Sequence, residues 1–185
     1  MTNNYVPVNY KRGEPDLMAL VDSENLKHVS EHTWYLSPAG YAWTFVQGVP
    51  KPITMHRMVA GIYHSLAAYQ IVDHANNDRL DNRFGNLRIC TMQENNWNRR
   101  VHSNNKIGLK GVYARSDKYR ATIRRNGVFY HLGDYSDKWM AALAYNTAAT
   151  ALFGDYAWHN EIPARYADCV NDLAPAVMKL AWVGG

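Results

Sequence analysis

An aspartate and a histidine stand side by side at residues 73 and 74, within the stretch VDHANNDRLDNRFGNLRICTMQENNWN (72–98). The carboxylate of Asp73 and the side-chain carbonyl of Asn95 are hard oxygen ligands that suit Mg²⁺ or Mn²⁺, and they leave most of an octahedral shell to water and phosphate. The imidazole of His74 can take a proton from water near neutral pH. A metal ion, a base and a field of arginines are what phosphodiester hydrolysis requires.

The elements that position these side chains are short. IVDH and LRIC are typical of strands, with a polar loop between them. Thr91 and Glu94 have the spacing of a capping box, which predicts a helix from about Met92 to about Arg100. This strand–loop–strand–helix unit places Asp73 and His74 at a strand end and Asn95 near the helix start, where they can face one another across a shallow cleft.

Three other interpretations of the stretch are weaker. A calcium-binding EF-hand loop that begins at Asp73 has Ala75, Asp78 and Phe84 at the positions of a ligand, the glycine and the final glutamate. A zinc site needs more clustered Cys and His than His74 and Cys90 supply. The third interpretation makes His74 a buried structural histidine and the asparagines turn formers. The ordered series of Asp, His, Asn and a capped helix favours the catalytic interpretation.

Positive charge gathers in the middle of the chain. The formal net charge is +4, but twelve Lys or Arg and three acids lie between Arg79 and Arg125, a local net charge of +9 against −5 elsewhere. Such asymmetry favours a polyanionic partner. It makes four arginines near the Asp-His pair candidates for contacting a nucleic-acid backbone: Arg83, Arg88, Arg99 and Arg100.

The chain divides into segments of different composition, and together these segments predict an α+β fold. Short aromatic or β-branched runs between residues 17 and 55 predict a small antiparallel sheet with its turn near Pro38 and Gly40, and MHRMVAGIYH (55–64) predicts a helix. The strand–loop–strand–helix unit follows and completes a first domain, residues 1–100. VHSNNKIG (101–108) has the polar composition of a linker.

Beyond the linker, three strand patterns and one helix pattern predict a three-stranded antiparallel sheet packed on one helix. In KYRATIRRNG, three polar residues alternate with apolar ones and give one basic face: Arg120, Thr122 and Arg124. Ser136 is the expected N-cap of the helix and Gly154 its expected end. Residues 161–185 are expected to form a helical tail, interrupted near Pro175.

The stretch 72–98 resembles the HNH nuclease motif, in the form found in phage and intron homing endonucleases, and HTWYLSPAGYAW and ITMHRMVAG upstream resemble the same group. The resemblance implies a ββα-metal unit in which Asp73 and Asn95 hold one divalent ion, Mg²⁺ or Mn²⁺, in each active site. It makes His74 the general base and Asn86 the residue that pins the loop and orients His74. Asn95 stands where the family often has His, as in some nicking homing enzymes.

Residues 109–160 resemble a second family, the apetala-type DNA-binding domain of plant ethylene-response factors, through KGVY, KYRATIRRNG, HLGDY and AALAYNTAATALFGDYAWHN. That fold lays a three-stranded sheet in the major groove. The resemblance makes Lys110, Lys118 and Arg124 DNA contacts. Thr122 replaces a Glu of the plant domains and His131 a Trp, so the plant sequence preference does not carry over.

These observations predict a metal-dependent, site-specific endonuclease that acts on double-stranded DNA and leaves 5′-phosphate and 3′-hydroxyl ends. One active centre per chain predicts a nick, and the protein is expected to be a monomer or weak dimer. Two cysteines, no bilayer-length apolar run and no signal-like N-terminus predict a cytoplasmic protein without a membrane partner. The resemblance to phage enzymes implies a bacterial or phage-infected cell. A non-catalytic DNA-binding regulator and an RNA nuclease are the alternatives.

Overall fold

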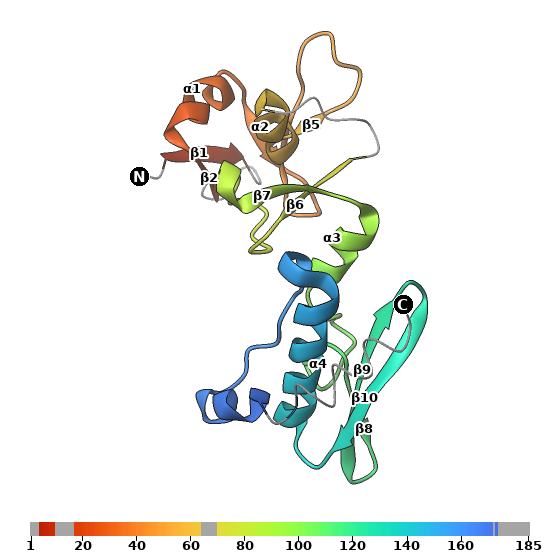
Figure 1. The fold of residues 1–185 in the computed structure, drawn as a ribbon. Helices are drawn as coiled ribbons and strands as arrows, with labels where there is room; N and C mark the ends of the chain where they lie inside the picture. Colours follow the sequence, from red (N-terminus) through yellow and green to blue (C-terminus); the bar gives the residue numbers. More distant parts are fainter. Residues whose placement is uncertain (1–3, 10–16, 64–69, 172, 174–185) are drawn as a thin grey trace. The chain divides into compact units, whose positions relative to one another are not determined.

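The structure is a computed structural model that describes residues 4–9, 17–63, 70–171 and 173, and it has a mixed α+β fold (Figure 1). The chain forms two compact units, Met1–Asn95 and Asn96–Gly185. The predicted fold class is confirmed: an N-terminal sheet, a central ββα unit, and a three-stranded antiparallel sheet against a helix. No helix in the described residues has the length and apolar character needed to cross a bilayer.

The N-terminal sheet has five strands in the order β2-β1-β3-β4-β5, with two helices. The strands are β1 (Asn4–Asn9), β2 (Leu17–Val21), β3 (Trp34–Leu36), β4 (Ala42–Thr44) and β5 (Ile53–Thr54), and the helices are α1 (Ser23–Ser30) and α2 (Met55–Tyr63). The sheet was expected to be antiparallel, but β1 and β3 pair in parallel because α1 carries the chain from β2 across to the other side of β1.

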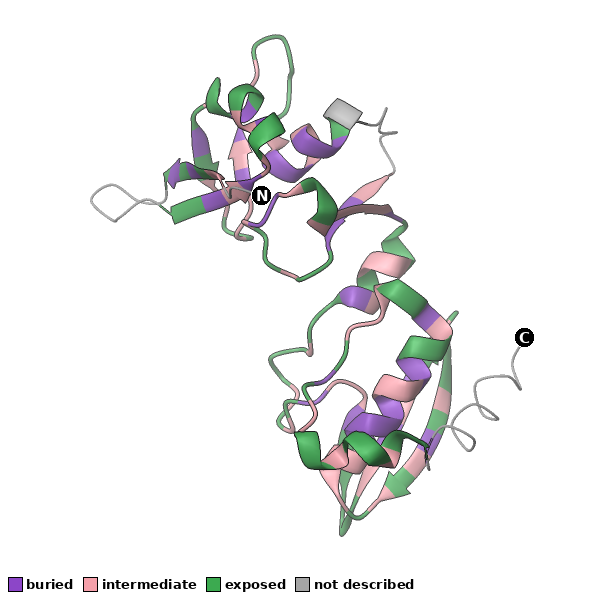
Figure 2. Cartoon of the chain, turned by 60° about the vertical axis from the view of Figure 1, so that its left-hand side comes forward, coloured by how far each residue is buried: buried purple, intermediate pink, exposed green. Residues whose placement is uncertain are grey.

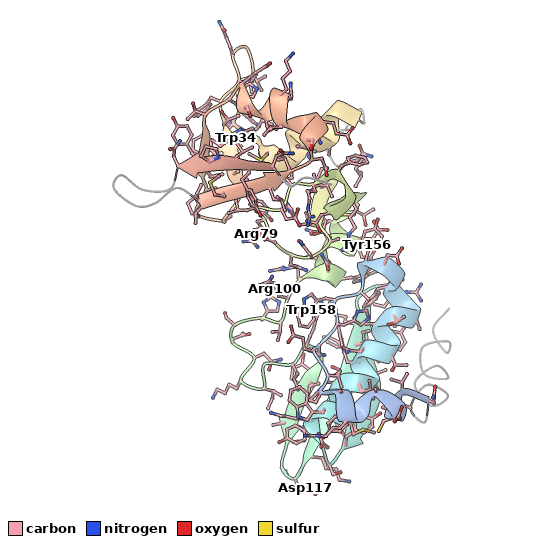
Figure 3. All side chains as sticks on the ribbon, turned by 90° about the vertical axis from the view of Figure 1, so that its left-hand side faces the viewer. Trp34, Arg79, Arg100, Asp117, Tyr156 and Trp158 are labelled. Atoms are coloured by element: carbon pink, nitrogen blue, oxygen red, sulfur yellow. The ribbon has the colours of Figure 1, made fainter. Side chains whose placement is uncertain are left out.

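The core of this unit is built from one face of the sheet and from both helices. Trp34 is 1% exposed and its indole nitrogen donates to the carbonyl of Val29 in α1 at 2.8 Å. Val8, Val21, Met55 and Val59 have no exposed surface. Figure 3 labels Trp34 among the side chains of this unit. This packing holds α1 and α2 against the sheet.

The ββα unit consists of β6 (Ile71–His74), a short 3₁₀ turn (Phe84–Asn86), β7 (Leu87–Cys90) and α3 (Met92–Asn98). The capping box is confirmed: Glu94 Oε2 accepts from the Thr91 backbone N–H at 2.8 Å, and Thr91 Oγ1 accepts from the Glu94 N–H at 3.2 Å. The helix ends at Asn98, two residues before the expected end. Strands β6 and β7 pair in antiparallel register, with Asp73 opposite Arg88.

In the second unit, β8 (Val112–Arg115), β9 (Lys118–Arg125) and β10 (Val128–Tyr135) form the sheet, and α4 (Lys138–Phe153) covers one face. Ala121 and Ile123 are buried, as the alternation predicted, and Figure 2 shows the buried residues along α4. They include Ala141, Ala142, Ala144, Ala148 and Ala149. The predicted N-cap Ser136 is wrong, because the Asp137 carboxylate accepts from Trp139 N at 2.7 Å. Gly154, with φ 53°, ends the helix as expected.

The connecting and terminal segments contain little regular structure. Residues 101–108 have no helix or strand, and Asn105 Oδ1 accepts from the backbone N–H groups of Ile107 and Gly108. Two 3₁₀ helices follow α4, at Gly154–Tyr156 and Ala164–Cys169. The second of them lies in the expected helical tail, residues 161–185, and the expected interruption near Pro175 lies outside the described residues.

Candidate active site

His74 is the last residue of β6, and the structure buries its ring. Its side chain contacts two other rings: the centroid of His56 in α2 lies 5.0 Å away in a T-shaped arrangement, and that of Tyr41 lies 5.8 Å away. His74 Nε2 lies 3.3 Å from Asn82 Oδ1. The residue is 3% exposed. Rings on one side and an amide on the other therefore fix the orientation of this imidazole.

Burial favours the neutral form of both histidines in this cluster. It is the main cause that lowers the pKa of His74, opposed by the hydrogen bond with Asn82 and by the nearby carboxylates of Asp73, Asp78 and Asp81. Burial, followed by the charges of His74 and Arg57, lowers the pKa of His56 to about 3. A neutral imidazole at position 74 has a lone pair available for a proton, as a general base requires.

Asp73 precedes His74, and in the register of β6 and β7 it stands opposite Arg88. Arg88 donates to Asp73 Oδ2 from Nη2 at 2.8 Å and from Nε at 3.2 Å, and the two side chains are 19% and 9% exposed. Arg88, expected to contact DNA, therefore neutralises the proposed metal ligand in this structure. A contact between Arg88 and DNA stays a prediction.

The thiol of Cys90 interacts with both the Asp73 carboxylate and the backbone of Asn95. Burial is the main cause that raises the pKa of Cys90 to about 11; the carboxylates of Asp73 and Glu94 raise it further, and a backbone hydrogen bond from Asn95 opposes them. Asp73 and the first turn of α3 therefore act on the same buried atom. A shared metal site formed by the side-chain oxygens of Asp73 and Asn95 stays a prediction.

Asn86 holds the loop between β6 and β7. Its Nδ2 donates to Asn76 Oδ1 at 3.0 Å and to the carbonyl of Asp81 at 2.7 Å, while its Oδ1 accepts from the Asn76 backbone N–H at 3.0 Å. Its own carbonyl accepts from the N–H of Ala75 at 2.9 Å. Asn86 pins the loop through these bonds, and the residue at Nε2 of His74 is Asn82.

The predicted donor set, Asp73 with Asn95, would suit a hard divalent ion. Among the residues that the structure describes, no three or more His, Cys, Asp or Glu side chains gather as a metal site. One carboxylate and one amide carbonyl, with water and a substrate phosphate to complete the shell, match the way proteins bind Mg²⁺. Such an ion would compete with Arg88 for the Asp73 carboxylate.

The other predicted arginines near the site differ in their partners. Arg83 pairs with Asp81 through two hydrogen bonds of 2.8 Å, and its side chain is 40% exposed. Arg99 and Arg100 follow α3 and are exposed. The pairing of Arg83 holds the loop in shape.

In the second unit, the face of the sheet away from α4 carries the predicted DNA contacts. Arg120 donates to Asp134 at 2.8 and 2.9 Å, and Arg124 lies over Phe129, which is 65% exposed, at 5.0 Å from the ring centroid. Thr122 pairs with His131 across β9 and β10. Exposed Lys118 begins β9 beside the turn at Asp117, which Figure 3 labels.

The side chain of Lys110 contacts the backbone of this unit. Its Nζ donates to the carbonyls of Trp97 and Arg99, each at 2.6 Å, and burial followed by the charge of Arg99 lowers its pKa to about 8. The ammonium therefore caps the C-terminal end of α3. A contact between Lys110 and DNA stays a prediction, and the sequence pattern did not indicate this capping role.

Sequence reasoning missed three residues around His74. Tyr41, His56 and Asn82 were not singled out as site residues, yet all three contact the His74 ring. The signals were weak: His56 lies in the predicted helix 55–64, and Asn82 is one of six asparagines between residues 76 and 96. Their proximity arises from tertiary packing.

Comparisons with known proteins identify the family of this chain. Residues 42–97, which contain Asp73, His74, Asn86 and Asn95, match the HNH endonuclease family. An uncharacterised HNH endonuclease of Acanthamoeba polyphaga mimivirus is 30% identical over 146 residues, which are 78% of this chain and 75% of that protein. No solved structure matches the chain. The chain therefore belongs to the HNH endonuclease family, whose substrate is DNA.

Proposed function

We propose that this protein is a metal-dependent, site-specific endonuclease that nicks double-stranded DNA and leaves 5′-phosphate and 3′-hydroxyl ends. The observation that carries the proposal is the arrangement at the end of β6, where a buried, neutral imidazole adjoins a carboxylate. HNH endonucleases generally use a divalent metal ion. The donor set of Asp73 and Asn95 fits one such ion, Mg²⁺ or Mn²⁺.

Each side chain has a separate role in this proposal. His74 takes a proton from the attacking water, Asn86 holds the loop, and Asp73 and Asn95 hold the ion. When bound, the ion would neutralise a phosphate oxygen and stabilise the departing 3′ oxygen. Arg83, Arg88, Arg99 and Arg100 orient the DNA backbone, and Arg88 would be free for a phosphate once a bound ion took over the Asp73 carboxylate. One active centre per chain cuts one strand.

The second unit supplies site preference in this proposal, as an apetala-type DNA-binding domain (residues 109–160) joined to the nuclease domain (residues 1–100) by the linker 101–108. Its support is the sheet face opposite α4, which presents Arg120, Thr122 and Arg124 beside exposed Tyr113 and Phe129. Guanidinium groups read guanine edges, and apolar rings contact thymine methyl groups. The pairing of Arg120 with Asp134 holds its fork in one orientation.

Supercoiled plasmid DNA is the substrate that tests the nuclease proposal. With Mg²⁺ or Mn²⁺, the wild-type protein should convert it to the nicked circle before linear DNA forms, with 5′-phosphate ends that ligase can reseal. EDTA should stop the reaction. Activity in excess EDTA would exclude the metal assignment, and direct appearance of linear product would exclude nicking by one centre.

A further inference from the structure

Asn82 is buried in the loop between β6 and β7, and its polar groups have partners in different parts of the first unit. It has no exposed surface. Its backbone N–H donates to the carbonyl of Leu20 in β2 at 2.8 Å, and its Nδ2 donates to the carbonyl of Leu80 at 3.1 Å. Its Oδ1 lies 3.3 Å from Nε2 of His74. The loop and the N-terminal sheet therefore hold this amide in place.

The bond to Leu80 determines which atom of the amide faces the imidazole. A carbonyl oxygen only accepts hydrogen bonds, so the atom that contacts Leu80 O must be the NH₂ group of Asn82. The oxygen then faces His74. An amide oxygen also only accepts, so Nε2 of a neutral His74 must carry the proton and Nδ1 the lone pair.

The rings around His74 restrict rotation of its imidazole. A rotation of the imidazole by half a turn would replace Nε2 by a carbon at the amide oxygen, and it would have to occur against His56 at 5.0 Å and Tyr41 at 5.8 Å. Tyr41 is itself covered by the guanidinium of Arg79 at 4.9 Å from its centroid. The ring is therefore held in one orientation as well as in one tautomer.

We propose that Asn82 is a positioning residue of the nuclease, which keeps the His74 proton on Nε2 so that Nδ1 is the atom that accepts the proton of the attacking water. This rests on the proposed role of His74 as the base. One O–H bond of water breaks, its proton passes to Nδ1, the water oxygen bonds to phosphorus, and the 3′ oxygen leaves with its electron pair. Nε2–H remains on Asn82 Oδ1 as a charge-assisted bond to the imidazolium.

This proposal separates the functions of two asparagines. Asn86 donates both of its amide hydrogens to groups inside the loop, those of Asn76 and Asp81. It therefore shapes the segment that contains Asn82. Asn82 is the residue that contacts the imidazole. A substitution at Asn86 should therefore affect His74 only through the shape of the loop. A substitution at Asn82 removes a direct contact with the His74 ring.

The direct test is ¹⁵N NMR of the full-length protein with labelled histidine, at a pH where His74 is neutral. The expected spectrum assigns a pyridine-like nitrogen to Nδ1 of His74 and a pyrrole-like nitrogen to Nε2; His74→Gln identifies the signals. The opposite assignment, or a fast average of both tautomers, would overturn the proposal. Because the spectrum does not depend on cleavage, this result is independent of whether His74 is the base.

Two substitutions distinguish positioning from simple loop stability. Asn82→Leu removes the acceptor and should lower the single-turnover cleavage rate by about 10²-fold, with little change in DNA affinity and with a mixed tautomer signal. Asn82→Asp keeps an oxygen at Nε2, so it should keep the wild-type tautomer and cut faster than Asn82→Leu. Equal losses in both variants, with the wild-type tautomer in each, would make Asn82 structural only.

Asn76→Ala is the matched control, because the hydrogen bonds between side chains that it removes go to Asp81 and Asn86 in the loop and leave Asn82 in place. It should lower the melting temperature and leave the tautomer unchanged. A change of tautomer in Asn76→Ala as large as that in Asn82→Leu would show that loop order alone sets it. If Asn82→Leu does not fold, the wild-type and Asn82→Asp spectra still show which nitrogen of His74 carries the proton.

Discussion

Arg88 and Asp73 form an ion pair across the β6–β7 hairpin, with Nη2 of the arginine 2.8 Å from Oδ2 of the aspartate. Both side chains are largely buried, so removal of one partner leaves a charge with little access to water. The pair therefore holds the Asp73 carboxylate beside a positive charge. If Asp73 is a metal ligand, as we propose, a divalent ion would have to compete with Arg88 for the same carboxylate.

A double-mutant cycle tests the energetic role of this pair. Asp73→Asn alone should destabilise the protein by about 1–3 kcal/mol, and Asp73→Asn with Arg88→Met should recover part of that loss. Urea unfolding of the four proteins measures the coupling. The more exposed Arg120–Asp134 pair is the matched control and should show a smaller coupling. Equal couplings would mean that burial does not strengthen the Asp73–Arg88 pair.

Loss of the base should affect chemistry and spare binding. His74→Ala should lower the cleavage rate by about 10²–10⁴-fold, the usual contribution of a general base, with DNA affinity close to that of the wild type. Single-turnover cleavage and a binding titration on the same duplex measure the two effects. His28→Ala, at an exposed position of α1, is the control and should cut normally. Normal cutting by His74→Ala would leave His74 as a structural residue.

Loss of the proposed amide ligand should appear as a changed requirement for metal. Asn95→Ala removes one oxygen from the site but leaves the capping box of α3, formed by Thr91 and Glu94, unchanged. The variant should need more Mg²⁺ or Mn²⁺ for half-maximal cleavage, or should not cut at all. Asn96→Ala, at the exposed next position of the helix, is the control. An unchanged metal titration in Asn95→Ala would remove Asn95 from the ligand set.

His56 should make the protein sensitive to acid. Its pKa is about 3 in the folded protein and near 6.5 in an unfolded chain. Between these values the unfolded chain binds a proton that the folded protein does not, so the free energy of unfolding falls as the pH falls through 6.5 towards 3. The limiting slope is about 1.4 kcal/mol per pH unit for this one group. His56→Gln should reduce the slope between pH 7 and 5, measured by urea unfolding; an unchanged slope would contradict it.

The two basic residues Lys110 and Arg124 should behave differently. Lys110→Met removes hydrogen bonds to two carbonyls and should lower the stability of the second unit by about 1–3 kcal/mol, with no change in the salt dependence of DNA binding. Arg124→Ala should weaken binding, and the salt slope should fall by about one if Arg124 contacts phosphate. Lys106→Met, at an exposed position, controls for the lost charge. A reduced salt slope in Lys110→Met would contradict this and would mean that Lys110 contacts DNA.

Local patterns predicted the elements of the ββα unit well, because they depend on neighbours in sequence. Thr91 and Glu94 lie three residues apart, and their reciprocal hydrogen bonds start α3 where the capping box indicated. The alternation in β9 likewise identified Ala121 and Ile123 as the buried face. Residue spacing alone was sufficient for these features.

Features that depend on distant partners were not predictable in this way. Helix α1 has a weak pattern, with Asn25 and Val29 as its buried residues, and Asp22 at its N-cap accepts instead from the N–H of Phe84. The pairing of Arg88 with Asp73 follows from the strand register. The environment of His74 depends on a loop, a helix and the segment before β4, which no short pattern connects.

The loop between β6 and β7 is also joined to β2: Leu20 N–H donates to the carbonyl of Leu80 at 2.7 Å, and Asn82 N–H returns to the carbonyl of Leu20 at 2.8 Å. The segment that matches the family begins at residue 42, after β2 has ended. A transplanted fragment with these family boundaries would leave backbone groups of the loop between β6 and β7 without their partners. Because β2 joins the rest of the sheet only through β1, the smallest fragment suited to domain grafting includes both strands and extends at least from Asn4 to Asn98.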